Sequence, residues 1–256
     1  MKESLHPTIL FHFTKTKKAL FNILAETFKI SYAKESIQGI GNKREVGVPM
    51  VSFCDLKLHD LKQHIKNYGT YGIGLTKDWA NKNGLNPVLY TNSECELIGN
   101  LMNALNGIYA HLKTVNTQPE YNALTDNYNN VLNLYRYTKN YEGPLRRKGK
   151  LVDTKYRFAD EREWRYVPSI SNPDILPFLP IDKIDTPSKK KRWNQRISQH
   201  RLQFQPDDIR YLIVKDDADI NDLQVHLRKV KSRFDEPTIQ RLSSRILTTY
   251  QINRDI

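Results

Sequence analysis

Three side chains in this sequence are of the types that carry out acid–base chemistry on a phosphate ester. His12 lies in Phe11-His-Phe-Thr14 near the start of the chain, and Glu163 and Arg165 are separated by one residue in the latter half. An imidazole and a carboxylate can act as general base and general acid, and a guanidinium fits phosphate oxygens. A metal-free ribonuclease built on these three residues is therefore one hypothesis for the function.

Each of these residues also has a purely structural interpretation. A histidine in a strand is often packed or capped, and Glu161-Arg-Glu-Trp-Arg165 could be a salt-bridged strand edge. Cys54, in an apolar segment, is typical of an inert core thiol. These alternatives stay open until the positions of the side chains are known.

The functional hypothesis requires elements that bring His12 and Glu163 to one cleft. A strand over residues 8–13, followed by a helix over 16–26 with helically spaced Ala19, Leu20, Ile23 and Leu24, would carry His12 at its end. The segment 163–167 alternates like a strand, which places Glu163 and Arg165 on one side and Trp164 and Tyr166 on the other. We expect the two strands to face a common hollow.

A glycine-rich segment lies between them in the sequence. Tyr68-Gly-Thr-Tyr-Gly-Ile-Gly-Leu-Thr76 has three glycines in six positions, which costs chain entropy. Something must therefore approach or bend this backbone closely, and Tyr68 and Tyr71 become candidate site residues.

The remaining sequence predicts a single α+β domain over residues 1–256. We expect a polar loop at 39–47, a basic turn at 143–150 and a helical insertion between about 93 and 140. The other expected strands cover 48–54, 86–90 and 209–214; the other expected helices cover 58–67, 77–83, 220–233 and 238–250.

Charge and composition favour polyanionic partners. The chain has 40 Lys and Arg against 28 Asp and Glu, a formal net charge of +12. The candidate nucleic-acid contacts are the basic residues Arg146, Arg147, Lys148, Lys189, Lys190, Lys191 and Arg192. The same runs would also suit simple solvated faces.

No apolar stretch resembles a signal peptide or a membrane span, and two cysteines cannot form a disulfide framework. We therefore expect a cytoplasmic protein that does not contact a membrane. His59 and His64 are five residues apart, which is not the spacing of a helical zinc pair, so no metal site is expected.

Several of these segments resemble the ADP-ribosyltransferase core. They are Leu10-Phe-His-Phe-Thr14 followed by Ile23-Leu24 and Phe28, the strand Gly69–Leu75, and Glu161-Arg-Glu163. The resemblance implies a split mixed β-sheet that binds NAD, with Glu163 as the catalytic carboxylate that stabilises an oxocarbenium-like transition state. It also implies that His12 holds the ribose and that the backbone at Phe13 and Thr14 holds the carboxamide. Tyr71 or Tyr68 would cover the nicotinamide, and Arg165 or Arg162 would neutralise the pyrophosphate.

A longer resemblance is to the AbiGi family of bacterial abortive-infection proteins. The segments that carry it are 5–7, 10–14, 48–55, 68–75, 82–89 and Glu161-Arg-Glu-Trp-Arg-Tyr-Val-Pro168. This resemblance implies anti-phage defence in a two-gene system, as an antitoxin with a partner protein from a neighbouring gene. Two interpretations follow: an NAD-dependent transferase acting on nucleic acid or protein, or a non-catalytic module that binds a toxin or DNA.

Overall fold

A mixed β-sheet organises the computed structural model, which describes residues 7–147 and 150–255. All its strand pairs are antiparallel except the parallel pair β14 and β15. The strands follow the spatial order β15 (Ile246–Thr248), β14 (Ile209–Val214), β5 (Tyr71–Thr76), β1 (Ile9–Thr14), β4 (Asn42–Cys54), β11 (Glu163–Tyr166) and β6 (Asn86–Pro87), with β3 (Ser31–Gly39) and β12 (Leu179–Pro180) also paired to β4. The mixed α+β class is therefore as expected.

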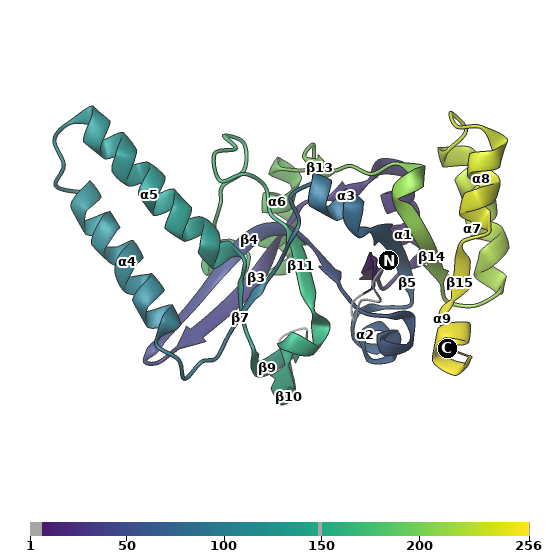
Figure 1. Ribbon diagram of the computed structural model, residues 1–256, viewed down its shortest axis with the longest axis horizontal. Coiled ribbons are helices and arrows are strands. Elements are labelled where there is room, and N and C mark those ends of the chain that lie inside the picture. The colour runs from purple at the N-terminus through teal and green to yellow at the C-terminus, as the bar shows by residue number, and fades with distance from the viewer. Residues whose placement is uncertain (1–6, 148–149, 256) are drawn as a thin grey trace.

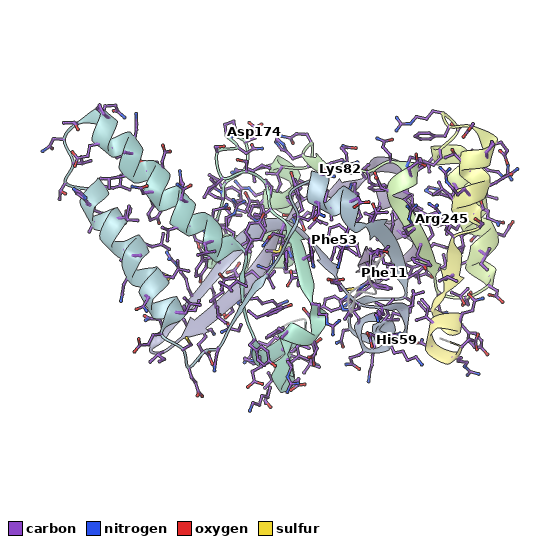
Figure 2. All side chains as sticks on the ribbon, viewed as in Figure 1. Phe11, Phe53, His59, Lys82, Asp174 and Arg245 are labelled. Atoms are coloured by element: carbon purple, nitrogen blue, oxygen red, sulfur yellow. The ribbon has the colours of Figure 1, made fainter. Side chains whose placement is uncertain are left out.

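Strand β1 lies in the interior of this sheet, between β5 and β4, and four of its six residues are buried. It pairs with β5 along its whole length and meets β4 where Phe11 lies opposite Cys54. Its alternate residues point to two different hydrophobic clusters, one containing Leu10 with Phe53 and the other containing Phe11 with Cys54. Phe11 and Phe53 are labelled in Figure 2. The sheet is thus covered by packed core on both faces here.

Helices from distant parts of the chain cover the two faces. The Leu10 face is packed by α1 (Lys17–Glu26), α3 (Lys77–Lys82), α7 (Ala218–Val230) and α8 (Glu236–Ser243). The Phe11 face is packed by α2 (Leu61–Tyr68) and α9 (Thr249–Arg254). Helix α1 begins where the Thr16 hydroxyl accepts a hydrogen bond from the Ala19 N–H at 3.2 Å, a standard N-cap.

The predicted polar loop at 39–47 is wrong. Strands β3 and β4 form a long hairpin in which Gly39 pairs with Asn42, so most of that segment is strand. The buried residues of β3 are Tyr32, Ile37 and Gly39, and polar residues lie between them. The exposed residues within the two strands are Lys34, Ser36 and Gln38 on β3 and Asn42, Lys43 and Arg44 on β4, whereas 46–51 of β4 are buried without interruption.

A helical hairpin, α4 (Leu97–Leu112) with α5 (Gln118–Arg136), occupies the expected insertion. Figure 1 shows these two helices side by side, projecting away from the sheet. Their base packs through Ile98 and Tyr135 against the β3–β4 hairpin. The hairpin leaves and re-enters the fold at two neighbouring parallel strands, β7 (Leu89–Thr91) and β8 (Thr138–Asn140). We call residues 97–136 the helical arm.

Two further segments differ from expectation. The basic turn at 143–150 belongs to a hairpin of β9 (Glu142–Arg147) and β10 (Lys150–Arg157). The single C-terminal helix at 238–250 is wrong, because α8, β15 and α9 share that stretch. The remaining elements are β2 (Phe28–Lys29), β13 (Arg201–Leu202), α6 (Pro187–Arg196) and the 3-10 turns Leu58–Asp60, Phe158–Glu161, Ile181–Lys183 and Pro206–Asp208. In the part of the chain that the structure describes, no helix has the length and apolar character to cross a bilayer.

Candidate functional site

His12 and Glu163 lie on opposite faces of the sheet. Phe11 pairs with Cys54 on β4, and Cys54 pairs with Glu163 on β11, so the three side chains share one face. His12, the next residue along β1, points the other way. There its ring contacts Phe28 and Phe53, with centroids 5.2 and 5.6 Å away. The predicted common cleft is therefore wrong.

The other predicted site residues divide in the same way. Thr14 and Tyr71 pair across β1 and β5 on the His12 face, where the Tyr71 hydroxyl donates to Asp219 Oδ2 at 2.8 Å. Those on the Glu163 face are Phe13, Tyr68 and Arg165. A single ligand cannot contact both groups through the packed sheet, so the predicted NAD-binding set is not assembled at one place.

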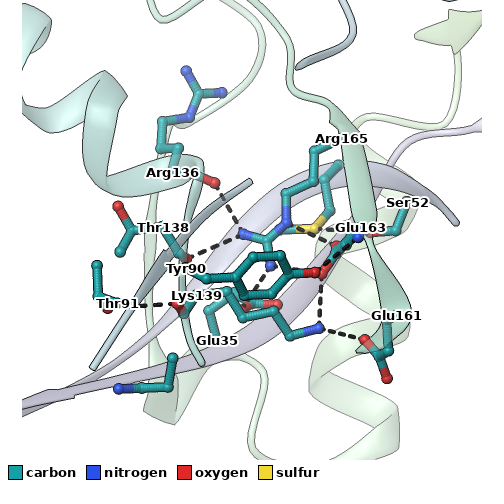
Figure 3. Close-up of polar contacts among 12 residues, drawn as sticks. Glu35, Ser52, Tyr90, Thr91, Arg136, Thr138, Lys139, Glu161, Glu163 and Arg165 are labelled. Atoms are coloured by element: carbon teal, nitrogen blue, oxygen red, sulfur yellow. Dashed lines mark hydrogen bonds and ion pairs between the residues drawn. The ribbon is translucent and has the colours of Figure 1, made fainter. Parts of the chain in front are cut away.

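Glu163 lies at the centre of a buried ion network, shown in Figure 3. Its Oε1 accepts hydrogen bonds from Ser52 Oγ at 2.7 Å and from Arg165 Nε at 2.8 Å. Its Oε2 accepts from Lys139 Nζ at 2.7 Å and from Arg165 Nη2 at 3.2 Å. Arg165 is fully buried and also pairs with Glu35 at 3.0 Å. Four elements, β3, β4, β8 and β11, are joined here.

The electrostatics of the network hold Glu163 ionised. Burial alone would raise the pKa of Glu163, but the positive charges of Arg165 and Lys139 outweigh burial and hold this pKa well below its ordinary value. Burial likewise opposes the charge on Lys139, while Glu163 and Glu161 raise its pKa well above the usual range. With four donors already bound, the Glu163 carboxylate has little capacity left for a substrate, and its evident role is to fix the strands around it.

Glu161 is the member of the network that borders open space. It accepts hydrogen bonds from Lys139 at 2.7 Å and from the hydroxyls of Tyr156, at 3.2 Å, and Tyr68. A hollow of 320 Å³ adjoins it, lined by Leu56, Asp60, Gln63, His64, Tyr156, Ala159, Asp160, Glu161 and Arg162. Glu161 was not among the predicted site residues, yet it lines a hollow.

The glycine-rich strand is explained by aromatic packing. A Cβ added to Gly72 would lie 2.9 Å from the Phe13 ring, and one added to Gly74 would lie 2.8 Å from the Phe11 ring. The close approach expected from the sequence is real, but side chains of β1 make it at these two glycines. Packing between neighbouring strands thus explains Gly72 and Gly74, whereas Gly69 ends α2 with a φ of 129°.

The predicted nucleic-acid contacts lie in two separate places. Arg146 and Arg147 belong to β9, whereas Lys189, Lys190, Lys191 and Arg192 belong to α6; Figure 1 shows the two elements well apart. Lys189 pairs with Asp185 at 3.0 Å, and burial lowers the pKa of Lys190. Lys148 lies outside the described residues. Nucleic-acid binding stays a prediction for these residues.

A basic hollow that the sequence analysis missed lies beside α2. Its volume is 460 Å³, and its charged lining residues are Lys15, Lys62 and Lys66. Lys62 and Lys66 are four residues apart on one helix, a like-charge spacing that disfavours the helix slightly. That spacing was the available signal, but only the fold brings Lys15 to the same hollow.

The comparisons with known proteins agree on one family. The family model described as "Putative abortive phage resistance protein AbiGi, antitoxin" matches residues 26–215. The abortive phage resistance protein AbiGi of Lactococcus lactis subsp. cremoris is 32% identical over 199 residues, which cover 72% of this chain and 78% of that protein. No solved structure matches the chain.

Proposed function

Because the chain belongs to the AbiGi family of abortive phage resistance proteins, we propose that it acts as an antitoxin-like module that binds a partner protein through the helical arm. The partner is the toxin of the same defence system. The word antitoxin in the family description supports a role in neutralising another protein. Binding, rather than chemistry at Glu163, is then the activity of this chain.

The observation that carries this proposal is the surface of the helical arm. The helical arm, residues 97–136, contains four charged side chains in 40 positions, Lys113, Glu120, Asp126 and Arg136, where the chain average of 27% would give about eleven. Four large apolar or aromatic side chains of the arm are exposed: Leu97, Tyr109, Tyr121 and Leu134. Depletion of charge and enrichment of tyrosine mark the core of protein–protein interfaces.

The arm is also available for contact, because little of it packs on the rest of the fold. The fully buried residues of α4 are Ile98 and Leu105, and those of α5 are Tyr135 and Arg136 at its base. The two helices contact each other along their length, as where the Tyr109 and Tyr128 rings lie 6.1 Å apart. A projecting pair of helices can present a large, rigid surface to a partner.

ADP-ribosyl transfer is the rival function, and the geometry favours it less. It would use His12 and Glu163 on one NAD molecule, whereas these residues lie on opposite faces and Glu163 is bound by Ser52, Lys139 and Arg165. The transferase function would be supported if the purified protein consumed NAD and if a folded Glu163→Gln variant did not.

The proposal is tested by co-expression with the neighbouring gene of the native locus. We expect that gene product alone to arrest growth, and this chain to restore growth and to co-elute with the product as one complex. The double variant Tyr109→Glu and Tyr121→Glu places two charges near the tip of the arm. It should weaken the complex by about tenfold or more and abolish rescue, because exposed tyrosines are frequent hot spots.

The matched control is Tyr250→Glu on α9, outside the arm. Tyr250 is as exposed as the arm tyrosines, at 55% against 52% for Tyr109 and 47% for Tyr121, so a general effect of charge would appear there too. Rescue should persist in this variant. Full rescue by the arm variant would contradict the proposal. So would the finding that the unaltered chain dimerises through the arm and does not bind the toxin.

A further inference from the structure

A small hollow beside His12 lies on the face of the sheet opposite the ion network. Its volume is 270 Å³, and it lies among β1, α1, β2 and β13. The polar lining residues are His12, Thr14, Asn22, Thr27, Lys29 and Arg201, and no carboxylate lines it. Ala19, Ile23, Phe28 and Val51 supply an apolar wall.

His12 presents a hydrogen-bond acceptor here. Its Nδ1 lies 2.8 Å from the Ser52 carbonyl oxygen, which can only accept, so Nδ1 carries the proton. Burial lowers the pKa of His12, more than the bond to Ser52 raises it, so the ring is neutral at neutral pH. Nε2 then carries a lone pair, and no other described residue forms a hydrogen bond with this ring. A ligand hydroxyl could donate to it.

Thr27 lines the same hollow in a strained backbone conformation. Its φ of 66° and ψ of −175° lie in a region that glycine alone adopts easily, at a cost of about 1–3 kcal/mol for other residues. Its hydroxyl oxygen is buried and has no hydrogen-bond partner within residues 7–147 and 150–255. Strain and an unpaired polar atom in one residue are typical of binding sites.

The hollow also has a modest excess of positive charge. Arg201 donates to the Glu26 carboxylate at 2.7 Å and to the Glu26 carbonyl at 2.9 Å. Lys29 lies 3.7 Å from the same carboxylate and is 57% exposed. Glu26 balances one of the two cations, so one positive charge remains for an anionic ligand group.

We propose that this hollow binds a small hydroxylated phosphate ester of about mononucleotide size. A hydroxyl of the ligand donates to His12 Nε2, and the phosphate lies against Lys29 and Arg201. The volume of 270 Å³ lies just below the range of about 300–1,000 Å³ for drug-sized ligands and is too small to enclose a dinucleotide. The proposal is independent of partner binding by the helical arm and involves no bond-making step.

The test is calorimetric titration of the full-length chain with AMP and ribose 5-phosphate, with adenosine, inorganic phosphate and NAD as comparison probes. We expect the two esters to bind more tightly than adenosine or phosphate alone by about tenfold or more, because only the esters engage both the acceptor and the cations. Equal binding of adenosine and AMP, or no binding of any probe at millimolar concentration, would overturn the proposal. NAD binding tighter than AMP would overturn the size limit.

Variants locate the bound ester. Asn22→Trp, on the exposed side of α1, should block the hollow, and Lys29→Gln should weaken ester binding by about tenfold. Lys66→Gln, in the basic hollow beside α2, is the control and should leave affinity unchanged. Thr27→Gly should raise the melting temperature of the free protein, because glycine adopts this backbone conformation without strain. Loss of binding in Lys66→Gln but not in Lys29→Gln would place the ligand elsewhere and refute the assignment.

Discussion

Replacement of Glu163 by glutamine should destabilise the fold. The substitution keeps the shape of the side chain but removes the charge that Arg165 and Lys139 share. Breaking a buried ion pair costs about 3–5 kcal/mol. In the variant, Arg165 still pairs with Glu35 and Lys139 still pairs with Glu161, so we expect a loss at the lower end, about 3 kcal/mol. The total stability of a typical domain is about 5–15 kcal/mol.

Urea unfolding of the two proteins measures this difference. The matched control is Glu45→Gln on β4, because Glu45 pairs with Lys34 and Lys43 at a more exposed position, where the loss should be below about 1 kcal/mol. A Glu163→Gln loss no larger than that of the control would refute the argument that the network holds the strands together. The m-value should stay unchanged in both variants.

The same network predicts a pH dependence with a definite sign. The pKa of Glu163 in the folded protein lies below its ordinary value of 4.5, because burial, which raises it, is outweighed by Arg165 and Lys139. Its contribution to stability is therefore complete above about pH 4.5 and is lost as the pH falls further. The stability difference between the unaltered protein and Glu163→Gln should shrink below pH 4.5; a difference that grows on acidification would contradict the assignment.

Two further predictions concern glycine and cysteine positions. Gly69→Ala should reduce the free energy of unfolding by about 3 kcal/mol or more, because the φ of Gly69 is 129° and a Cβ there would lie 2.1 Å from the Thr14 carbonyl oxygen. Gly107→Ala, in open space on α4, should instead stabilise the protein by about 0.5–1 kcal/mol. Thermal unfolding of both variants measures these changes. Burial, and the negative charges of nearby carboxylates, raise the pKa of the Cys54 thiol. A thiol-alkylating reagent should therefore label the exposed Cys95 before the buried Cys54, as measured by mass spectrometry. Equal labelling rates for the two cysteines would contradict the burial of Cys54.

Strands and helices with strong local patterns could be predicted from the sequence, and those set by pairing could not. Strand β14 was expected at its observed bounds because Ile209-Arg-Tyr-Leu-Ile-Val214 is apolar and β-branched. The β3 strand was missed because five of its nine residues are Ser, Lys, Glu or Gln, which leaves no apolar run. Residues 246–248 continue a helical pattern in the sequence, but pairing with β14 makes them a strand.

The sequence did not predict which face of the sheet each candidate site residue occupies. The sequence gives the alternation within 163–166, and the structure agrees that Glu163 and Arg165 share a side. Which side that is, relative to His12, depends on the pairing of Phe11 with Cys54 and of Cys54 with Glu163. A shift of one residue in either pairing would have reversed the answer, and no single strand contains that information.

The helical arm joins the rest of the fold at one narrow base, so its tip contributes little to the packing of the sheet. Strands β7 and β8 lie next to each other, as Leu89 with Thr138 and Thr91 with Asn140, so the chain leaves and returns at nearly the same point. Substitutions toward the tip touch few residues of the sheet and cost it little. If the arm binds a toxin as proposed, it can change as that toxin diverges without loss of the fold, and exchanging the arm between relatives should redirect binding.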